Sequence, residues 1–171
     1  MMKRIGSLPG AAGWVAALYL ALCGTAAFSS EGAPVGGRSP ERIQGVWNVT
    51  VTLTNCLTGV PLPFPGATFD AMSIFEADGT LHDTNANSPV TRSAAFGQWE
   101  RTGPLQYRFA FRFFRFDNGG LLTGSQIVRH DVTMSPDGES YVSNGTAEFY
   151  DTAGNPTMPD GCSESVATRF R

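Results

Sequence analysis

The sequence predicts an all-β protein, an eight-stranded antiparallel up-and-down barrel with a short N-terminal helical turn. Beyond about residue 40, apolar and polar side chains alternate in short segments, as they do in half-buried strands. No later stretch has the 3.6-residue apolar period of an amphipathic helix. Short turn signals join consecutive segments, which favours an antiparallel meander, and eight strands is the number that closes a small barrel.

The expected barrel begins with one helical turn and its clearest strand. Ser39 suits the N-cap, Pro40 suits the first helical position, and Glu41 suits the positive end of the helix dipole. Residues 45–55 then alternate strictly between apolar and polar side chains, with one face dry and one wet. The apolar positions of this strand are Trp47, Val49, Val51 and Leu53.

The later strands are separated by turn sequences. Asp78-Gly79 is a tight-hairpin signal, Asp117 to Gly120 forms another turn, and residues 57–66 form a proline-rich loop. The remaining strands are expected at residues 68–76, 80–85, 92–101, 105–116, 121–134, 140–150 and 162–170.

The N-terminal region divides into two segments before the barrel domain at residues 40–171. Residues 1–27 combine a basic start, an apolar run and small residues at the end, which predicts a secretory signal peptide. Residues 28–39 are rich in glycine and proline and are expected to form a flexible linker. The chain is therefore expected to be secreted or periplasmic. An uncleaved anchor, or lipidation at Cys23, are the alternatives.

Removal of the signal peptide would leave two cysteines, Cys56 and Cys162, in an oxidising compartment. A disulfide between them would close a loop of about 105 residues, which the chain-entropy model values at about 4–5 kcal/mol. Cys56 ends the first strand and Cys162 begins the eighth, so the disulfide and the closed barrel support each other. Two buried free thiols are the alternative.

Charge excludes several functional classes. Lys3 is the only lysine, so the mature chain would have 10 arginines against 15 acids, and its net charge would move from −3 to −5. Lysine-dependent chemistry is excluded, and nucleic acid is not an expected partner, because phosphate neutralisation needs a cationic surface. Two histidines make a metal site unexpected. No cofactor and no stable membrane span after cleavage are expected, and the oligomeric state stays open.

Gly45-Val46-Trp47 on the first strand resembles the Gly-x-Trp signature of lipocalins and the wider calycin group. That resemblance implies an arginine packed over Trp47, for which Arg169 is the best match and Arg171 the second. The other lipocalin motifs and the long C-terminal helix are missing. Three blocks also resemble an uncharacterised family of secreted bacterial proteins: Gly97 to Trp99, Phe111 to Phe116, and Gly161-Cys162.

The fifth strand places Tyr107, Phe109, Phe111 and Phe113 on one face, and the alternation then breaks. A β-bulge near the break would keep the later aromatic residues inward. These residues are expected to form either an aromatic wall around an apolar cavity or a packed core, and both interpretations stay open.

The sixth strand places two polar residues, Gln126 and His130, on its apolar face. Buried polar groups need partners, which could be core hydroxyls such as those of Tyr107 and Tyr141, or a bound ligand. A satisfied structural histidine is the simpler interpretation. On the seventh strand, small residues at positions 143, 145 and 147 leave room for a cavity.

The leading functional hypothesis is an exported barrel that binds a small hydrophobic or amphipathic molecule in its lumen. The expected ligand-binding residues are Tyr107, Phe109, Phe111, Gln126, His130 and Tyr141. The binding hypothesis requires a cavity of several hundred Å³ that is open at one end. One alternative is an enzyme with His130 as acid or base and a tyrosine partner. The other is a ligand-free structural or interaction module of the cell envelope, which an exposed apolar patch at residues 57–66 would favour.

Overall fold

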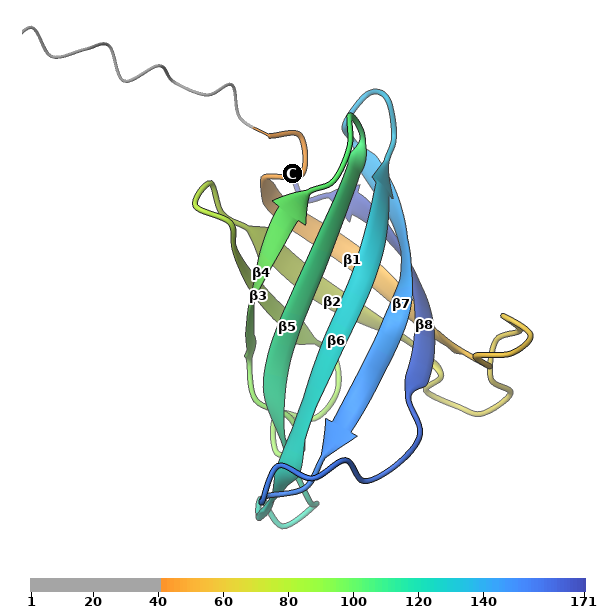
Figure 1. Cartoon of the computed structure of the whole chain (residues 1–171), viewed down its shortest axis with the longest axis vertical. Helices are drawn as coiled ribbons and strands as arrows, with labels where there is room; N and C mark the ends of the chain where they lie inside the picture. The colour runs from red at the N-terminus through yellow and green to blue at the C-terminus, as the bar shows by residue number, and fades with distance from the viewer. Residues whose placement is uncertain (1–40) are drawn as a thin grey trace, which may run out of the picture. The chain divides into compact units, whose positions relative to one another are not determined.

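The computed structural model describes residues 41–171, so the expected signal peptide (1–27), the linker (28–39) and the residues Ser39 and Pro40 lie outside the described residues. Eight strands follow one another along the chain (Figure 1). They are β1 (Gly45–Thr54), β2 (Thr68–Phe75), β3 (Thr80–Asn85), β4 (Ala95–Arg101), β5 (Gln106–Phe116), β6 (Leu122–Met134), β7 (Ser140–Tyr150) and β8 (Gly161–Arg169).

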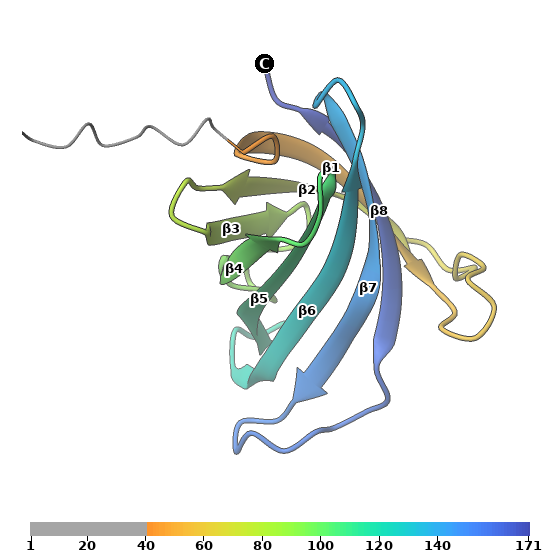
Figure 2. The same cartoon turned by 45° about the horizontal axis from the view of Figure 1, so that its top comes forward.

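The strands close into a barrel in sequence order, and every neighbouring pair is antiparallel. Closure depends on β1 and β8, which pair from Trp47 opposite Arg169 to Thr54 opposite Cys162. Figures 1 and 2 show the strands winding around one axis, and the connections at residues 55–67, 86–94 and 151–160 are longer than the other four. The predicted fold class is confirmed, and closure removes the exposed strand edges that an open sheet would leave.

Two details differ from the sequence prediction. The residues before β1 form a single turn, in which the Gln44 amide donates to the Glu41 carbonyl at 3.0 Å, and residues 41–171 contain no helix. The fourth strand begins at Ala95 and not at Arg92. Arg92 instead makes an isolated antiparallel bridge with Arg115, which lies near the end of β5.

The turn before β1 closes one end of the barrel over a packed core. Trp47 is fully buried, and its indole N–H donates to the Ile43 carbonyl at 2.8 Å. The Arg169 guanidinium lies 4.4 Å from the Trp47 ring centroid, so the cation–π contact implied by the resemblance is present. The largest buried side chains of this end are Ile43, Trp47, Phe75, Leu81, Tyr107, Val132, Met134 and Tyr141.

The expected β-bulge is present, but it lies later than the break in alternation. Arg115 pairs with Gly124 and Phe116 pairs with Leu122, so Thr123 on β6 is the extra residue. Phe113 is buried, whereas Phe114 is half exposed on the outer face. The expectation that the bulge turns the later aromatic residues inward is therefore wrong for Phe114, because the bulge inserts its residue on the partner strand.

Candidate functional site: a cavity in the barrel lumen

The half of the barrel away from the Trp47 core is hollow. Its cavity has a volume of about 670 Å³ and is lined by every strand except β4. Loop residues from 55–67, 86–94 and 151–160 line its mouth. These three loops connect strands at the end of the barrel opposite the turn before β1 (Figures 1 and 2). The barrel therefore has one packed end and one open end.

Aromatic side chains of β5 form one wall of the cavity. The rings of Phe109 and Phe111 stack at 5.9 Å between centroids, and Phe113 follows at 6.3 Å from Phe111. Because successive side chains of a strand point to opposite faces, these three alternate residues all lie on the inner face of β5. The sequence left open whether this row packs a core or lines a cavity, and all three rings line the cavity.

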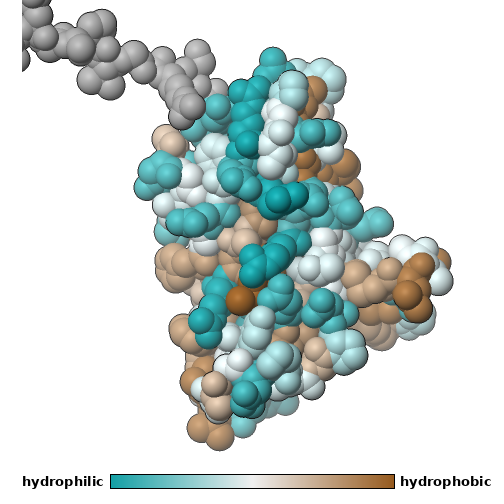
Figure 3. Space-filling view, in the orientation of Figure 1, coloured by the Kyte–Doolittle hydropathy of each residue, from teal (hydrophilic) through white to brown (hydrophobic). Residues whose placement is uncertain are grey.

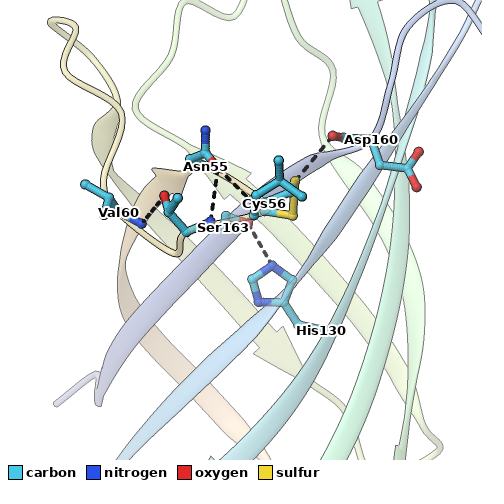
Figure 4. The surroundings of a disulfide bond; sticks show 9 residues. Asn55, Cys56, Val60, His130, Asp160 and Ser163 are labelled. Atoms are coloured by element: carbon cyan, nitrogen blue, oxygen red, sulfur yellow. Dashed lines mark hydrogen bonds between the residues drawn. A yellow bond between two sulfur atoms is a disulfide. The ribbon is translucent and has the colours of Figure 1, made fainter.

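His130 lies on β6 beside this wall, and protein hydroxyls satisfy both of its ring nitrogens. Nδ1 lies 2.9 Å from Ser143 Oγ, and Nε2 lies 2.9 Å from Ser163 Oγ. Its ring also stacks on Phe109 at 5.3 Å. Figure 4 shows the imidazole pointing toward Ser163, next to the disulfide. The expected core hydroxyl partners are therefore present, but they belong to serines on β7 and β8 and not to Tyr107 or Tyr141.

Burial lowers the pKa of His130 to about 4, and the nearby Asp131 carboxylate opposes this only weakly. The imidazole is therefore neutral at pH 7, with one nitrogen donating a hydrogen bond and the other accepting one. Asp131 itself is exposed and pairs with Arg108 outside the barrel at 2.9 Å. The sequence neighbours His130 and Asp131 do not form a catalytic dyad, as strand geometry predicts.

The other expected ligand-binding residues divide between the two halves of the barrel. Tyr141 lines the cavity and contacts Trp47 edge-on at 5.0 Å, so it lies at the cavity floor. Gln126 is half-buried and lines the cavity wall. Tyr107 does not line the cavity, since it packs edge-on against Trp99 in the closed end, with its hydroxyl 3.4 Å from Glu41 Oε2. The structure thus brings together five of the six expected residues.

A buried charged cluster in the cavity was not anticipated from the sequence. Arg92 Nη2 donates to Asp83 Oδ1 at 2.6 Å, and the Ser73 hydroxyl donates to Asp83 Oδ2 at 2.8 Å. The guanidinium also lies 4.2 Å from the Phe113 ring centroid. Burial raises the pKa of Asp83, while Arg92 and Ser73 oppose that shift. The lumen is therefore amphipathic, with a charged group set among apolar walls.

The predicted disulfide between Cys56 and Cys162 is present at the cavity rim. The two Cα atoms are 5.1 Å apart across a sequence separation of 106 residues. The bond joins the loop after β1 to the start of β8, beside the strand pair that closes the barrel (Figure 4). A disulfide is consistent with an oxidising, extracytoplasmic location.

Within residues 41–171, no helix is long and apolar enough to cross a membrane. The same residues contain no group of three or more histidine, cysteine, aspartate or glutamate side chains placed to hold a metal ion.

The loop between β1 and β2 projects from the barrel with apolar side chains outward. Leu57 is 95 % exposed, Val60 is 60 % exposed and Phe64 is 49 % exposed. Figure 3 shows this loop as a mostly apolar projection at the right of the molecule. The sequence of residues 55–67 contains no charged residue. An exposed apolar patch of this kind is typical of a contact surface.

Comparison with known proteins finds no matching family model, no matching curated protein and no matching solved structure. The resemblance to uncharacterised secreted bacterial proteins therefore gains no support. The closed barrel of eight antiparallel strands is compatible with the lipocalin-like fold that Gly45 to Trp47 indicates.

Proposed function

We propose that this chain is an exported barrel protein that binds a small hydrophobic or amphipathic molecule in its lumen. The observation that carries the proposal is the cavity of about 670 Å³, which lies within the size range of small-molecule sites, roughly 300–1,000 Å³. Apolar atoms supply most of the lining surface, although about half of the lining residues are polar, among them Asp83, Arg92 and Gln126. Export is supported by the disulfide and by the secretory pattern of residues 1–27.

Binding is favoured over catalysis by the state of His130. A general base works best when its pKa lies near the working pH, and burial holds the pKa of His130 at about 4. Both ring nitrogens are also engaged by serines. His130 therefore contributes a flat ring to the cavity wall beside Phe109 and is not suited to act as a general base.

Fluorescence titration with N-phenyl-1-naphthylamine, a neutral apolar probe, tests the proposal with two matched variants. Ala147 lines the cavity on β7, whereas Val142 lies on the outer face of the same strand. Ala147→Trp fills the lumen and is expected to weaken binding at least tenfold, while Val142→Trp leaves it within twofold of the wild type. Circular dichroism and the free-thiol count confirm that both variants fold. Equal binding by all three proteins, or no binding by the wild type, contradicts the proposal.

The exposed apolar loop supports a second candidate, a contact module of the cell envelope. The uncharged loop at residues 55–67 would dock on an uncharged surface such as a zwitterionic bilayer. Co-sedimentation with phosphatidylcholine vesicles tests this. The wild type is expected to pellet with the vesicles and a Leu57→Ser/Phe64→Ser variant to stay in solution, whereas a wild type that stays in solution contradicts the candidate.

A further inference from the structure

Two arginines occupy paired backbone positions in the cavity wall. Arg92 and Arg115 are partners in an isolated antiparallel bridge, and both side chains line the cavity. Side chains directly opposite each other in an antiparallel pair have Cβ atoms about 5 Å apart, and like charges there repel. A neighbouring negative charge offsets such repulsion.

The protein supplies only part of that charge. Asp83 neutralises Arg92 through its Nη2 atom, at 2.6 Å. Arg115 lies over the Phe149 ring at 5.2 Å, and no ion pair joins it to an acid within residues 41–171. The charged residues that line the cavity are Arg92, Arg115, Asp83 and Asp160, and Asp160 is exposed at the rim. Over residues 41–171, nine arginines and 14 acids sum to −5.

Arg92 also has unused hydrogen-bonding capacity. It is 9 % exposed, and its Nε has no hydrogen-bond partner among the described residues. Buried polar groups in proteins are almost always paired, and a guanidinium has five N–H donors. The unpaired Arg92 donor can therefore donate to an acceptor from outside the chain, such as a water molecule or an anion.

We propose that the lumen binds an amphipathic monoanion, whose single oxyanion is held between Arg92 and Arg115 and whose apolar body lies along the β5 aromatic wall. This inference rests on the proposed function, because it names the chemical class of the lumen ligand. The oxyanion, a carboxylate, sulfonate or phosphate, accepts charge-assisted hydrogen bonds from the two guanidinium groups. Phe113 and Phe149 lie under these groups and provide the boundary between the polar and apolar parts of the site.

Two fluorescent probes that differ by one sulfonate test the inference. 1-Anilinonaphthalene-8-sulfonate has the ring system of N-phenyl-1-naphthylamine plus one negative charge. The wild type is expected to bind the sulfonate at least about tenfold more tightly, which is the effect of a charge-assisted hydrogen bond. Binding of the sulfonate no tighter than that of the neutral probe overturns the inference without any variant.

Variants then locate the oxyanion. Arg115→Gln is expected to weaken sulfonate binding about tenfold and to change neutral-probe binding less than twofold. The double variant Asp83→Asn/Arg92→Gln removes both charges of the pair together, so no unpaired buried charge remains, and it is expected to have the same effect. Arg108→Gln is the control for Arg115→Gln, because Arg108 lies on the outer face of β5 and its substitution changes the net charge by the same amount.

The outcomes separate this inference from the proposed function. If the wild type binds neither probe, lumen binding itself fails. If the wild type binds the neutral probe and the ratio of the two dissociation constants is unchanged by the lumen substitutions, only the anion site fails. A loss of sulfonate binding that Arg108→Gln reproduces shows a general charge effect and also overturns the anion site.

Discussion

Arg169 joins the packed end of the barrel through one guanidinium. It stacks on Trp47 and donates to the carbonyls of Arg42, Gln44 and Gly138 at 2.7–2.9 Å. A lysine keeps the charge but has a compact ammonium, so it cannot stack and reach three carbonyls at once.

Arg169→Lys is therefore expected to lower the free energy of unfolding by about 2–3 kcal/mol, the combined effect of a lost cation–π contact and lost charged hydrogen bonds. Urea denaturation with the disulfide intact measures it. Arg171→Lys is the control, since Arg171 is mostly exposed and pairs only with Glu139, and it is expected to change stability far less than Arg169→Lys does. Equal effects of the two substitutions would contradict the role of Arg169.

His130 makes stability depend on pH in a defined window. An unfolded histidine binds a proton below about pH 6.5, whereas the folded His130 does so only below its pKa of about 4. The unfolded state takes up more protons as the pH falls between these values, so the stability that His130 contributes is complete above pH 6.5 and is lost toward pH 4.

His130→Gln is expected to remove this dependence. Between pH 7.5 and pH 4.5 the wild type should lose about 2–3 kcal/mol more of its unfolding free energy than the variant does. Urea denaturation at the two pH values measures the difference. His82→Gln, on the outer face against Phe96, should behave as the wild type does. A His130→Gln protein with the wild-type pH dependence would place its origin elsewhere.

At the scale of the element, β6 and β7 approach each other closely where Gly145 lies opposite His130. A Cβ atom at Gly145 would lie 1.8 Å from the Arg129 carbonyl oxygen and 2.5 Å from His130 Cδ2. Glycine is therefore required here for space, since its backbone angles are ordinary for a strand.

Gly145→Ala is expected to destabilise the barrel by about 3 kcal/mol or more, because neither the backbone oxygen nor the doubly hydrogen-bonded ring can move aside. Gly161→Ala is the matched control on β8, where the new methyl group would make only ordinary contacts at 3.5 Å or more. Thermal unfolding followed by circular dichroism compares them. Similar midpoints for the two variants would contradict the packing described for His130.

Alternation along the strands was enough to predict most elements and most of the cavity wall. It placed Phe109, Phe111 and His130 inward correctly, because each lies within a long, regular strand. It did not distinguish Tyr107 from Phe109, which share a face but lie in different halves of the barrel. Depth along the barrel axis depends on strand stagger, and periodicity carries no information about stagger.

The charged cluster was missed for two different reasons. Asp83 shares its strand face with the buried Leu81, so alternation contained a signal for an inward carboxylate. Arg92 lies in a loop, where no period applies, and only its bridge to Arg115 brings it into the lumen. The serine partners of His130 were also hidden, because they come from strands whose register the sequence does not specify.

At the scale of the whole molecule, the disulfide and the β1–β8 pairing hold the same seam of the barrel. The Cys56→Ser/Cys162→Ser variant is expected to lose about 4–5 kcal/mol of unfolding free energy, since the cross-link restricts a long loop of the unfolded chain. Its near-ultraviolet circular dichroism should stay native, because the strand pairing does not need the bond. Loss of the native spectrum in mild buffer would show that closure depends on the covalent bond.

The lumen is expected to take up a small apolar molecule, and every binding prediction depends on this. Methyl NMR of the wild type during titration with N-phenyl-1-naphthylamine tests it directly. The methyl groups of Val49, Val51, Ala71 and Ala147, which line the cavity, are expected to shift together and to saturate at one probe per barrel. Those of the exposed Val142 and Val166 should stay in place. Shifts confined to exterior methyl groups, or no shifts at all, would contradict the claim.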